Sequence, residues 1–154
     1  MSYLVVQWIH VLSSTLLFGT GIGSAFYLFV ATLRRDTALV AGVASMVVWA
    51  DWLFTATTAI LQPLTGLWLV HIAGFPLGTG WIAWSLALYV VAIGCWLPVV
   101  RLQMRMRNLA VAATRGNAEL PPEFWRCFRL WISLGTPAFF AFVAIFYLMV
   151  VKPA

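Results

Sequence analysis

The feature that most constrains this chain is an apolar sequence that runs almost from end to end. Of the 154 residues, 64% are hydrophobic and 8% are charged, whereas a soluble domain carries roughly 25% charged residues. A helix of ~20 apolar residues crosses the hydrocarbon core of a bilayer, so this length allows about four spans. No polar segment is large enough to form a separate soluble core. We therefore expect one all-α integral membrane domain, residues 1–154.

Charged residues and Gly/Pro-rich turns divide the chain into its expected membrane spans. These spans cover residues 4–33, 52–72, 81–100 and 130–151. Residues 38–50 are interpreted as an interfacial lead-in to the second span, and residues 101–129 as an Arg-rich cytoplasmic connection. Consecutive spans run in opposite directions, so the prediction is an antiparallel four-helix bundle.

Basic residues predict the orientation of this bundle. The connections after the first and third spans contain eight arginines, and the opposite side has only Lys152. Since basic connections stay in the cytoplasm, both termini are expected outside (N-out, C-out) in a multi-pass protein of the bacterial inner (plasma) membrane. The first span lacks the basic start of a cleavable signal peptide and is expected to be retained. The charges follow the membrane rule without any nucleic-acid-binding fold, so nucleic acid is not an expected partner.

The two histidines, His10 and His71, are the first candidates for a functional site. A titratable side chain inside a span is costly and usually functional. In the expected topology both lie in the outer half of the bilayer, with His10 roughly 9 Å below the outer end of its span at ~1.5 Å per residue. Neutral imidazole is a usual axial ligand of haem iron. The pair therefore predicts a b-type haem (haem b) with His10 and His71 as metal ligands.

Other interpretations of these residues stay open. His10 can instead hydrogen-bond a neighbouring carbonyl, and His71 can be an interfacial residue. A site with one histidine is a further alternative, with the Met149 thioether as second ligand. Gly19 and Gly23 form a small-xxx-small pattern, which gives clearance for a porphyrin or quinone face or serves plain helix packing.

Pro63 interrupts the middle of the second span. Proline removes a backbone donor and kinks a helix, and the side chains of Gln62 and Thr65 are expected to satisfy the freed groups. Such a kink either shapes a cavity for a cofactor or substrate or is a purely structural bend.

Asp51 and Trp131 are expected near the cytoplasmic interface. Asp51 would lie at head-group level, where pairing with Arg101 or Arg105, or simple solvation, is favoured over a role as a proton-relay carboxylate. Trp131 is expected in an aromatic belt on the inner side of the membrane.

Several sequence strings carry a family resemblance. They are Trp8-Ile9-His10, Ala50-Asp51-Trp52-Leu53-Phe54, Gln62-Pro63-Leu64-Thr65-Gly66, Trp96-Leu97-Pro98-Val99-Val100, Trp125-Arg126 and Gly135-Thr136-Pro137-Ala138-Phe139. Together they resemble a bacterial family of four-span predicted integral membrane proteins of unknown function (DUF2269-like). This resemblance implies a topology and no activity.

A more distant similarity is to HemJ-type haem-binding membrane proteins, which act as protoporphyrinogen oxidases. That family has a histidine early in its first span, in a Trp-rich context and ahead of a glycine, and His10 and Gly19 occupy comparable positions. The similarity implies haem binding through His10. That family also uses a lysine in a later span, and the expected spans of this chain contain none, which argues against protoporphyrinogen oxidation.

The leading hypothesis is an electron-transfer or redox protein with haem in the outer half of the bilayer. A redox protein or a quinone would be its partner, and Gly19 and Gly23 would give the porphyrin room. One alternative is a non-catalytic membrane subunit that assembles with a larger partner. Another is a small-solute permease that uses a cavity at Gln62 and Pro63 and acts as an oligomer. Enzymatic activity and the oligomeric state are left open.

Overall fold

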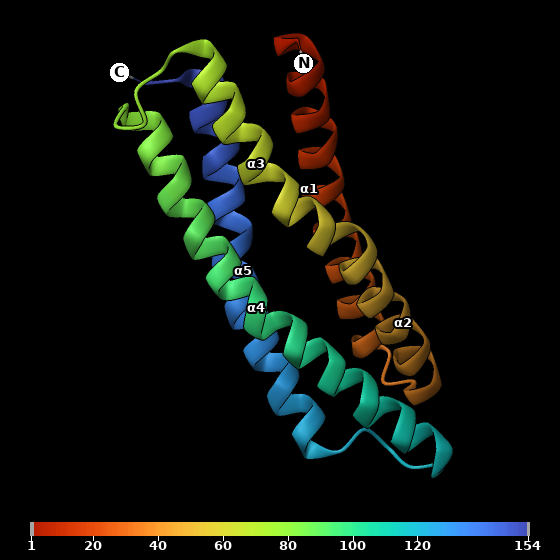
Figure 1. The fold of residues 1–154 in the computed structure, drawn as a ribbon. Coiled ribbons are helices and arrows are strands. Elements are labelled where there is room, and N and C mark those ends of the chain that lie inside the picture. Colours follow the sequence, from red (N-terminus) through yellow and green to blue (C-terminus); the bar gives the residue numbers. More distant parts are fainter. Residues whose placement is uncertain (1, 154) are drawn as a thin grey trace.

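The computed structural model describes residues 2–153, and this part of the chain is an all-α bundle (Figure 1). Its elements are α1 (Tyr3–Leu33), α2 (Thr37–Ala50), η1 (Asp51–Thr55), α3 (Ala56–Ala73), α4 (Gly80–Arg115) and α5 (Pro122–Val151). Because α2, η1 and α3 follow one another without a break, the described chain forms four long rods, each long and apolar enough to cross a membrane. The predicted four-helix membrane bundle is confirmed.

The second rod differs from its predicted division into a lead-in and a span. Residues 38–50 belong to the continuous helical run Thr37–Ala73, and Val40, Ala44 and Val47 are buried in the hydrophobic core. No helix breaker separates the two parts. Instead η1 makes one π-helical turn, in which the N–H of the residue after it, Ala56, donates to the Asp51 carbonyl. The N-terminal cap of α2 is Asp36, whose carboxylate accepts a hydrogen bond from the Leu39 N–H at 3.0 Å.

The Arg-rich connection is mostly helical. Helix α4 continues to Arg115 and α5 starts at Pro122, so residues 116–121 alone form the loop between them. Proline suits the first turn of a helix because its missing N–H would be unpaired there. Arg105 and Glu123 form an exposed ion pair across these two helices.

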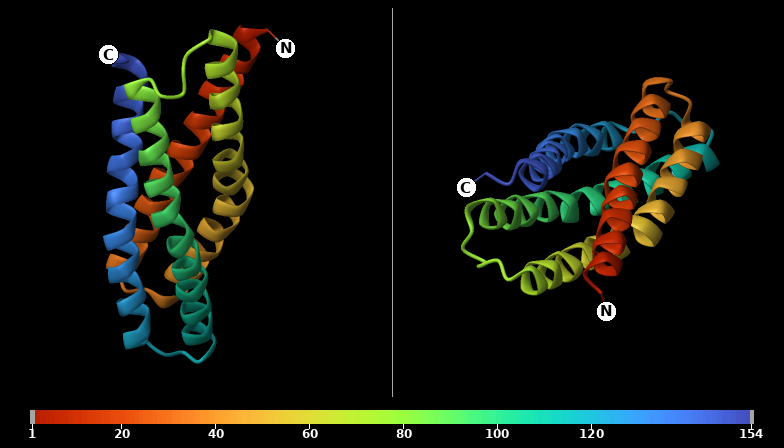
Figure 2. Two further views of the ribbon diagram at one scale, coloured as in Figure 1. Left: turned by 60° about the vertical axis from the view of Figure 1, so that its left-hand side comes forward. Right: turned by 90° about the horizontal axis from the view of Figure 1, so that it is seen from above.

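The helices pack as two pairs that separate toward one end of the molecule. Helix α4 packs along α5, and α1 packs against α3, while α2 packs against α4 and α1. The two pairs are therefore held together by α2 at the end that carries the 34–36 and 116–121 loops, and they diverge toward the termini (Figure 2). Both termini lie at the same end (Figures 1 and 2). The side of the membrane they face stays a prediction.

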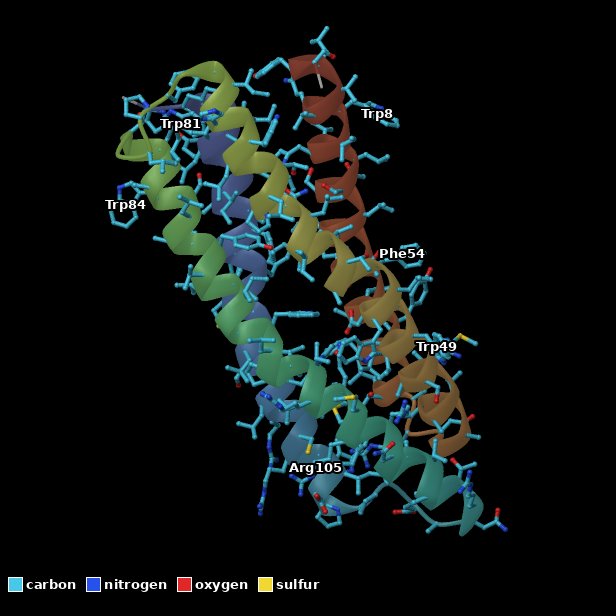
Figure 3. All side chains as sticks on the ribbon, viewed as in Figure 1. Trp8, Trp49, Phe54, Trp81, Trp84 and Arg105 are labelled. Carbon is cyan, nitrogen blue, oxygen red and sulfur yellow. The ribbon has the colours of Figure 1, made fainter. Side chains whose placement is uncertain are left out.

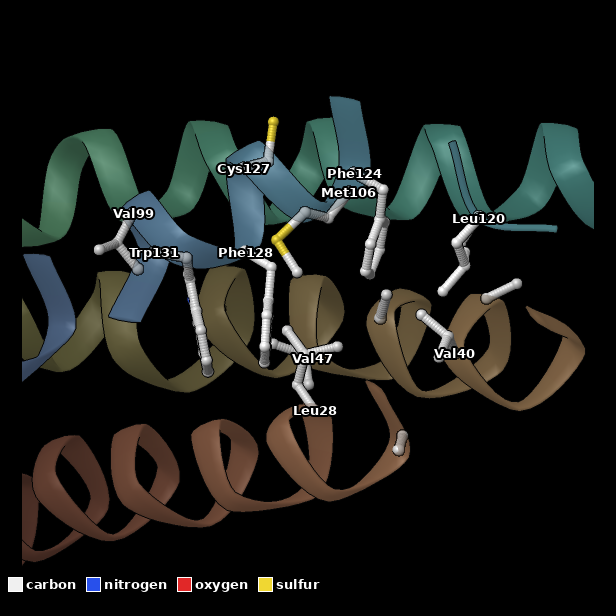
Figure 4. Packing of buried hydrophobic residues seen from close by; sticks show 14 residues of the cluster. Leu28, Val40, Val47, Val99, Met106, Leu120, Phe124, Cys127, Phe128 and Trp131 are labelled. Carbon is white, nitrogen blue, oxygen red and sulfur yellow. The ribbon is translucent and has the colours of Figure 1, made fainter. Parts of the chain in front are cut away.

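The hydrophobic core lies at the Arg-rich end of the bundle. The Phe128 ring stacks on Phe124 and on Trp131, with interplanar angles of 14° and 15°, between α5 and the α1–α2 layer (Figure 4). Trp131 is thus buried in the core. We expected it in an aromatic belt at the membrane interface, and this prediction is wrong. Its position within α5 turns it inward, whereas Trp49 and Trp84 face outward (Figure 3).

Replacement of Phe124 by alanine tests this core. Phe124 is 0% exposed, so Phe124→Ala should lower the free energy of unfolding by about 3–5 kcal/mol. The matched control is Phe140→Ala on the same helix, where the side chain is 61% exposed and the expected change is within about 0.5 kcal/mol. Reversible unfolding in detergent micelles measures both. Equal losses for the two variants would contradict the described packing.

Candidate functional site

Two cavities lie between the helix pairs. The outer cavity, nearer the termini, has a volume of about 340 Å³, and the inner cavity, nearer the core, has about 390 Å³. Leu17 and Phe142 line both and separate them. The side chains of the outer cavity that carry a polar atom or sulfur are those of His10, Ser14, Thr15, Gln62, Trp81, Ser85, Tyr89 and Met149.

His10 is fixed by helix α3. Its Nδ1 lies 2.7 Å from the Thr65 hydroxyl oxygen. The Thr65 hydroxyl also lies 2.8 Å from the Leu61 carbonyl, and when it donates there its oxygen accepts from His10 in the tautomer that carries the proton on Nδ1. A neutral imidazole with Nδ1 protonated has an unprotonated Nε2. The nitrogen left for the outer cavity is therefore an acceptor or a metal ligand.

Gly66 determines how closely the His10 ring approaches α3. A Cβ atom at position 66 would lie 3.2 Å from His10 Cε1, closer than ordinary van der Waals contact. The imidazole thus packs against the α3 backbone itself. Gly66 follows Gln62 by four residues, which places both on one face of the helix. That spacing is the signal in the sequence for this contact.

Gln62 adds a second polar link between α1 and α3. Its Nε2 donates to the His10 carbonyl at 2.9 Å and to Ser13 Oγ at 2.7 Å. The Ser13 hydroxyl in turn donates to the His10 carbonyl at 3.1 Å. We call His10, Ser13, Gln62 and Thr65 the α1–α3 clamp. Its buried donors and acceptors satisfy one another, which lets polar side chains stay inside an apolar bundle.

Tyr89 completes the backbone hydrogen bonds around Pro63. Because Pro63 has no N–H, the carbonyl of Ala59 loses its normal donor four residues later. Tyr89 of α4 donates its phenolic hydrogen to that carbonyl. We expected Gln62 and Thr65 to satisfy groups freed by Pro63, but these side chains serve the clamp. The sequence signal for Tyr89 is weak, since it is a lone tyrosine on another span.

The structure does not bring His71 to His10. His71 is exposed and lines neither cavity. It follows Gly66 by five residues, which at ~100° per residue turns it about 140° away from the face that contacts His10. Within residues 2–153 there is also no group of three or more His, Cys, Asp or Glu side chains placed so that it could hold a metal ion. The two predicted ligands therefore do not share a site in this arrangement.

Gly19 and Gly23 face open space. A Cβ atom at either position would meet nothing within 4 Å, and neither residue lines a cavity. Within the described chain they therefore neither border a cofactor space nor form a close helix contact.

Asp51 differs from its expected surroundings. It is buried, and the Thr55 hydroxyl donates to its Oδ1 at 3.0 Å. Arg105, one of its expected partners, is paired with Glu123 instead. Asp51 and Thr55 belong to the π-helical turn and line the inner cavity, and no pattern in the sequence predicts that turn.

The comparisons with known proteins identify a family. The family model described as "Predicted integral membrane protein (DUF2269)" matches residues 4–153. The chain therefore belongs to this family, and the description assigns no activity to it. No curated protein and no solved structure matches the chain. The similarity to HemJ-type proteins gains no support from these comparisons and stays a prediction from the sequence.

Enlarging Gly66 tests the contact between His10 and α3. In Gly66→Val the new side chain would overlap the imidazole, so we expect a loss of about 1–3 kcal/mol of unfolding free energy. Gly94→Val is the matched control, because a Cβ there meets nothing within 4 Å while the cost of a β-branched residue in a helix is the same. Thermal unfolding of the two purified variants measures the difference. A loss no greater in Gly66→Val than in Gly94→Val would contradict the close approach.

Proposed function

We propose that this member of the DUF2269 family binds haem b through His10 and serves electron transfer or redox chemistry in the bacterial inner membrane. The observation that supports the proposal most is the hydrogen bond between His10 Nδ1 and Thr65. Histidines that ligate metals usually donate their other ring N–H to a second group, which fixes the tautomer and the ring orientation. Thr65 is such a group, and Nε2 is the nitrogen that it leaves free.

The lining of the outer cavity also supports the proposal. Its walls include the apolar and aromatic side chains of Trp81, Phe142 and Phe146, and it also contains Met149. Met149 is the candidate for a second ligand in place of His71, because the thioether lines the same cavity as His10. A haem bound there would supply one-electron chemistry.

The chain's own residues would have separate tasks. His10 would ligate the iron, and Thr65 would hold the imidazole in the Nδ1–H tautomer. Gln62 and Ser13 would fix the α1 backbone at His10 through their hydrogen bonds to its carbonyl. The aromatic walls would exclude water, and the exclusion of water raises the strength of every polar contact inside the cavity.

An oxidised-minus-reduced optical spectrum tests this proposal on protein purified from cells supplied with haem precursors. We expect a b-type spectrum that His10→Ala abolishes and His71→Ala leaves unchanged. Thr65→Val should keep the spectrum but weaken haem affinity about 10–100-fold, as expected for loss of a group that orients a ligand. A wild-type protein without haem, or a His10→Ala variant with an unchanged spectrum, would overturn the proposal.

A second candidate function, assembly with a partner membrane protein, is favoured by Gly19 and Gly23. Small residues on an open helix face allow close contact with another helix, and both glycines are free of contacts within the described chain. Purification of the protein from its native membrane, with a search for a copurifying chain, tests this second function. A partner chain that is lost from Gly19→Leu, but retained by the control Gly42→Leu, supports assembly. Retention of the partner in both variants argues against this surface.

A further inference from the structure

The inner cavity contains three polar atoms that lack hydrogen-bond partners among the described residues. They are Asp51 Oδ2, Gln103 Oε1 and Trp131 Nε1, and their residues are 3%, 4% and 6% exposed. The three side chains come from η1, α4 and α5 and line the same cavity. Buried polar groups are nearly always paired. Three unpaired groups that converge from separate elements therefore point to a ligand that pairs with them.

The chemistry of these atoms defines the polar groups of the ligand. Gln103 Oε1 and an ionised Asp51 Oδ2 accept hydrogen bonds, and Trp131 Nε1–H donates one. A hydroxyl group both donates and accepts, so a ligand with two hydroxyls satisfies all three atoms. An ammonium group would satisfy the two acceptors and leave the indole N–H unpaired.

The rest of the cavity defines the body of the ligand. Its walls include the aromatic rings of Phe18, Trp96, Phe139 and Phe142, which suit a flat apolar ring. Ile22 and Phe26 of α1 also line the cavity and are themselves exposed, by 44% and 63%. In a bilayer that exposed surface faces lipid, so the cavity is reached from the membrane and its ligand is lipid-soluble.

Charge alone does not select the ligand. Asp51 is the one acidic side chain among the described residues that line the cavity, and no Lys or Arg lines it. An ammonium group would be attracted to an ionised Asp51 but would leave the Trp131 Nε1–H unpaired. A neutral hydroxylated ring pairs with all three atoms.

We propose that the inner cavity binds the ring of a lipid-soluble hydroquinone, whose hydroxyls donate to Asp51 and Gln103 and accept from Trp131. This site is separate from the outer cavity and does not depend on haem binding there.

Equilibrium dialysis of the full chain in lipid nanodiscs tests the proposal, with a decyl-substituted benzohydroquinone as probe under anaerobic conditions. The control ligand is its dimethyl ether, which keeps the ring and tail but cannot donate hydrogen bonds. We expect the ether to bind at least about tenfold more weakly, the effect of leaving a buried acceptor unpaired. Equal affinities, or tighter binding of decyltrimethylammonium, would overturn the proposal.

Matched variants locate the probe. Trp131→Phe removes the indole donor and keeps an aromatic ring, and it should weaken hydroquinone binding about tenfold. Trp84→Phe, at an exposed tryptophan outside both cavities, should leave the affinity unchanged. Gln103→Met removes the acceptor with little change in size and gives an independent measurement if Trp131→Phe folds poorly. Unchanged affinity in both cavity variants would exclude this site.

Discussion

A polar group inside a membrane bundle must find its partner within the bundle, and this constraint determines how the helices of the protein meet. The carbonyl that Pro63 frees at Ala59 receives the Tyr89 hydroxyl from α4, which links the two helix pairs. Next to this contact, the α1–α3 clamp pairs the polar groups between α1 and α3. With no water in the hydrocarbon core, each such group left alone would be costly. These few contacts fix how each helix is rotated about its axis. Apolar side chains pack equally well against lipid and therefore do not fix that rotation.

The divergence of the two helix pairs explains where the inner and outer cavities lie. The helix pairs are held together at the Arg-rich end by α2 and the stacked rings of Phe124, Phe128 and Trp131. Toward the termini they separate, and the space between them holds the inner and outer cavities. The two differ in chemistry. The outer cavity presents an imidazole whose orientation is fixed, and the inner one presents polar atoms without partners. The proposed histidine ligand and the proposed hydroquinone site would together suit a redox protein that exchanges electrons with a lipid-soluble carrier.

The spans could be predicted from the sequence because hydropathy and Arg placement report directly on membrane crossing. Gln62 and Pro63 were singled out because an amide and a proline stand out inside a span, but the partners of Gln62 were not predicted. The rotation of each helix could not be predicted, because it depends on packing between helices. His71 therefore turned out to be exposed, and Gly19 and Gly23 face open space. For the same reason Trp131 and Gln103 were not predicted to line one cavity with Asp51. The π-helical turn that contains Asp51 leaves no pattern in the local sequence.

The clamp is the central claim of this account, and a double-mutant cycle tests it most directly. The cycle combines Ser13→Ala with Gln62→Leu, the residues joined at 2.7 Å, and measures unfolding free energies in bicelles. Side-chain hydrogen bonds between membrane helices couple by about 0.6 kcal/mol on average and up to about 1.7 kcal/mol. We expect a coupling energy within this range, with the double variant less destabilised than the sum of the single variants. Strict additivity would contradict the clamp and the helix rotation on which both cavities depend.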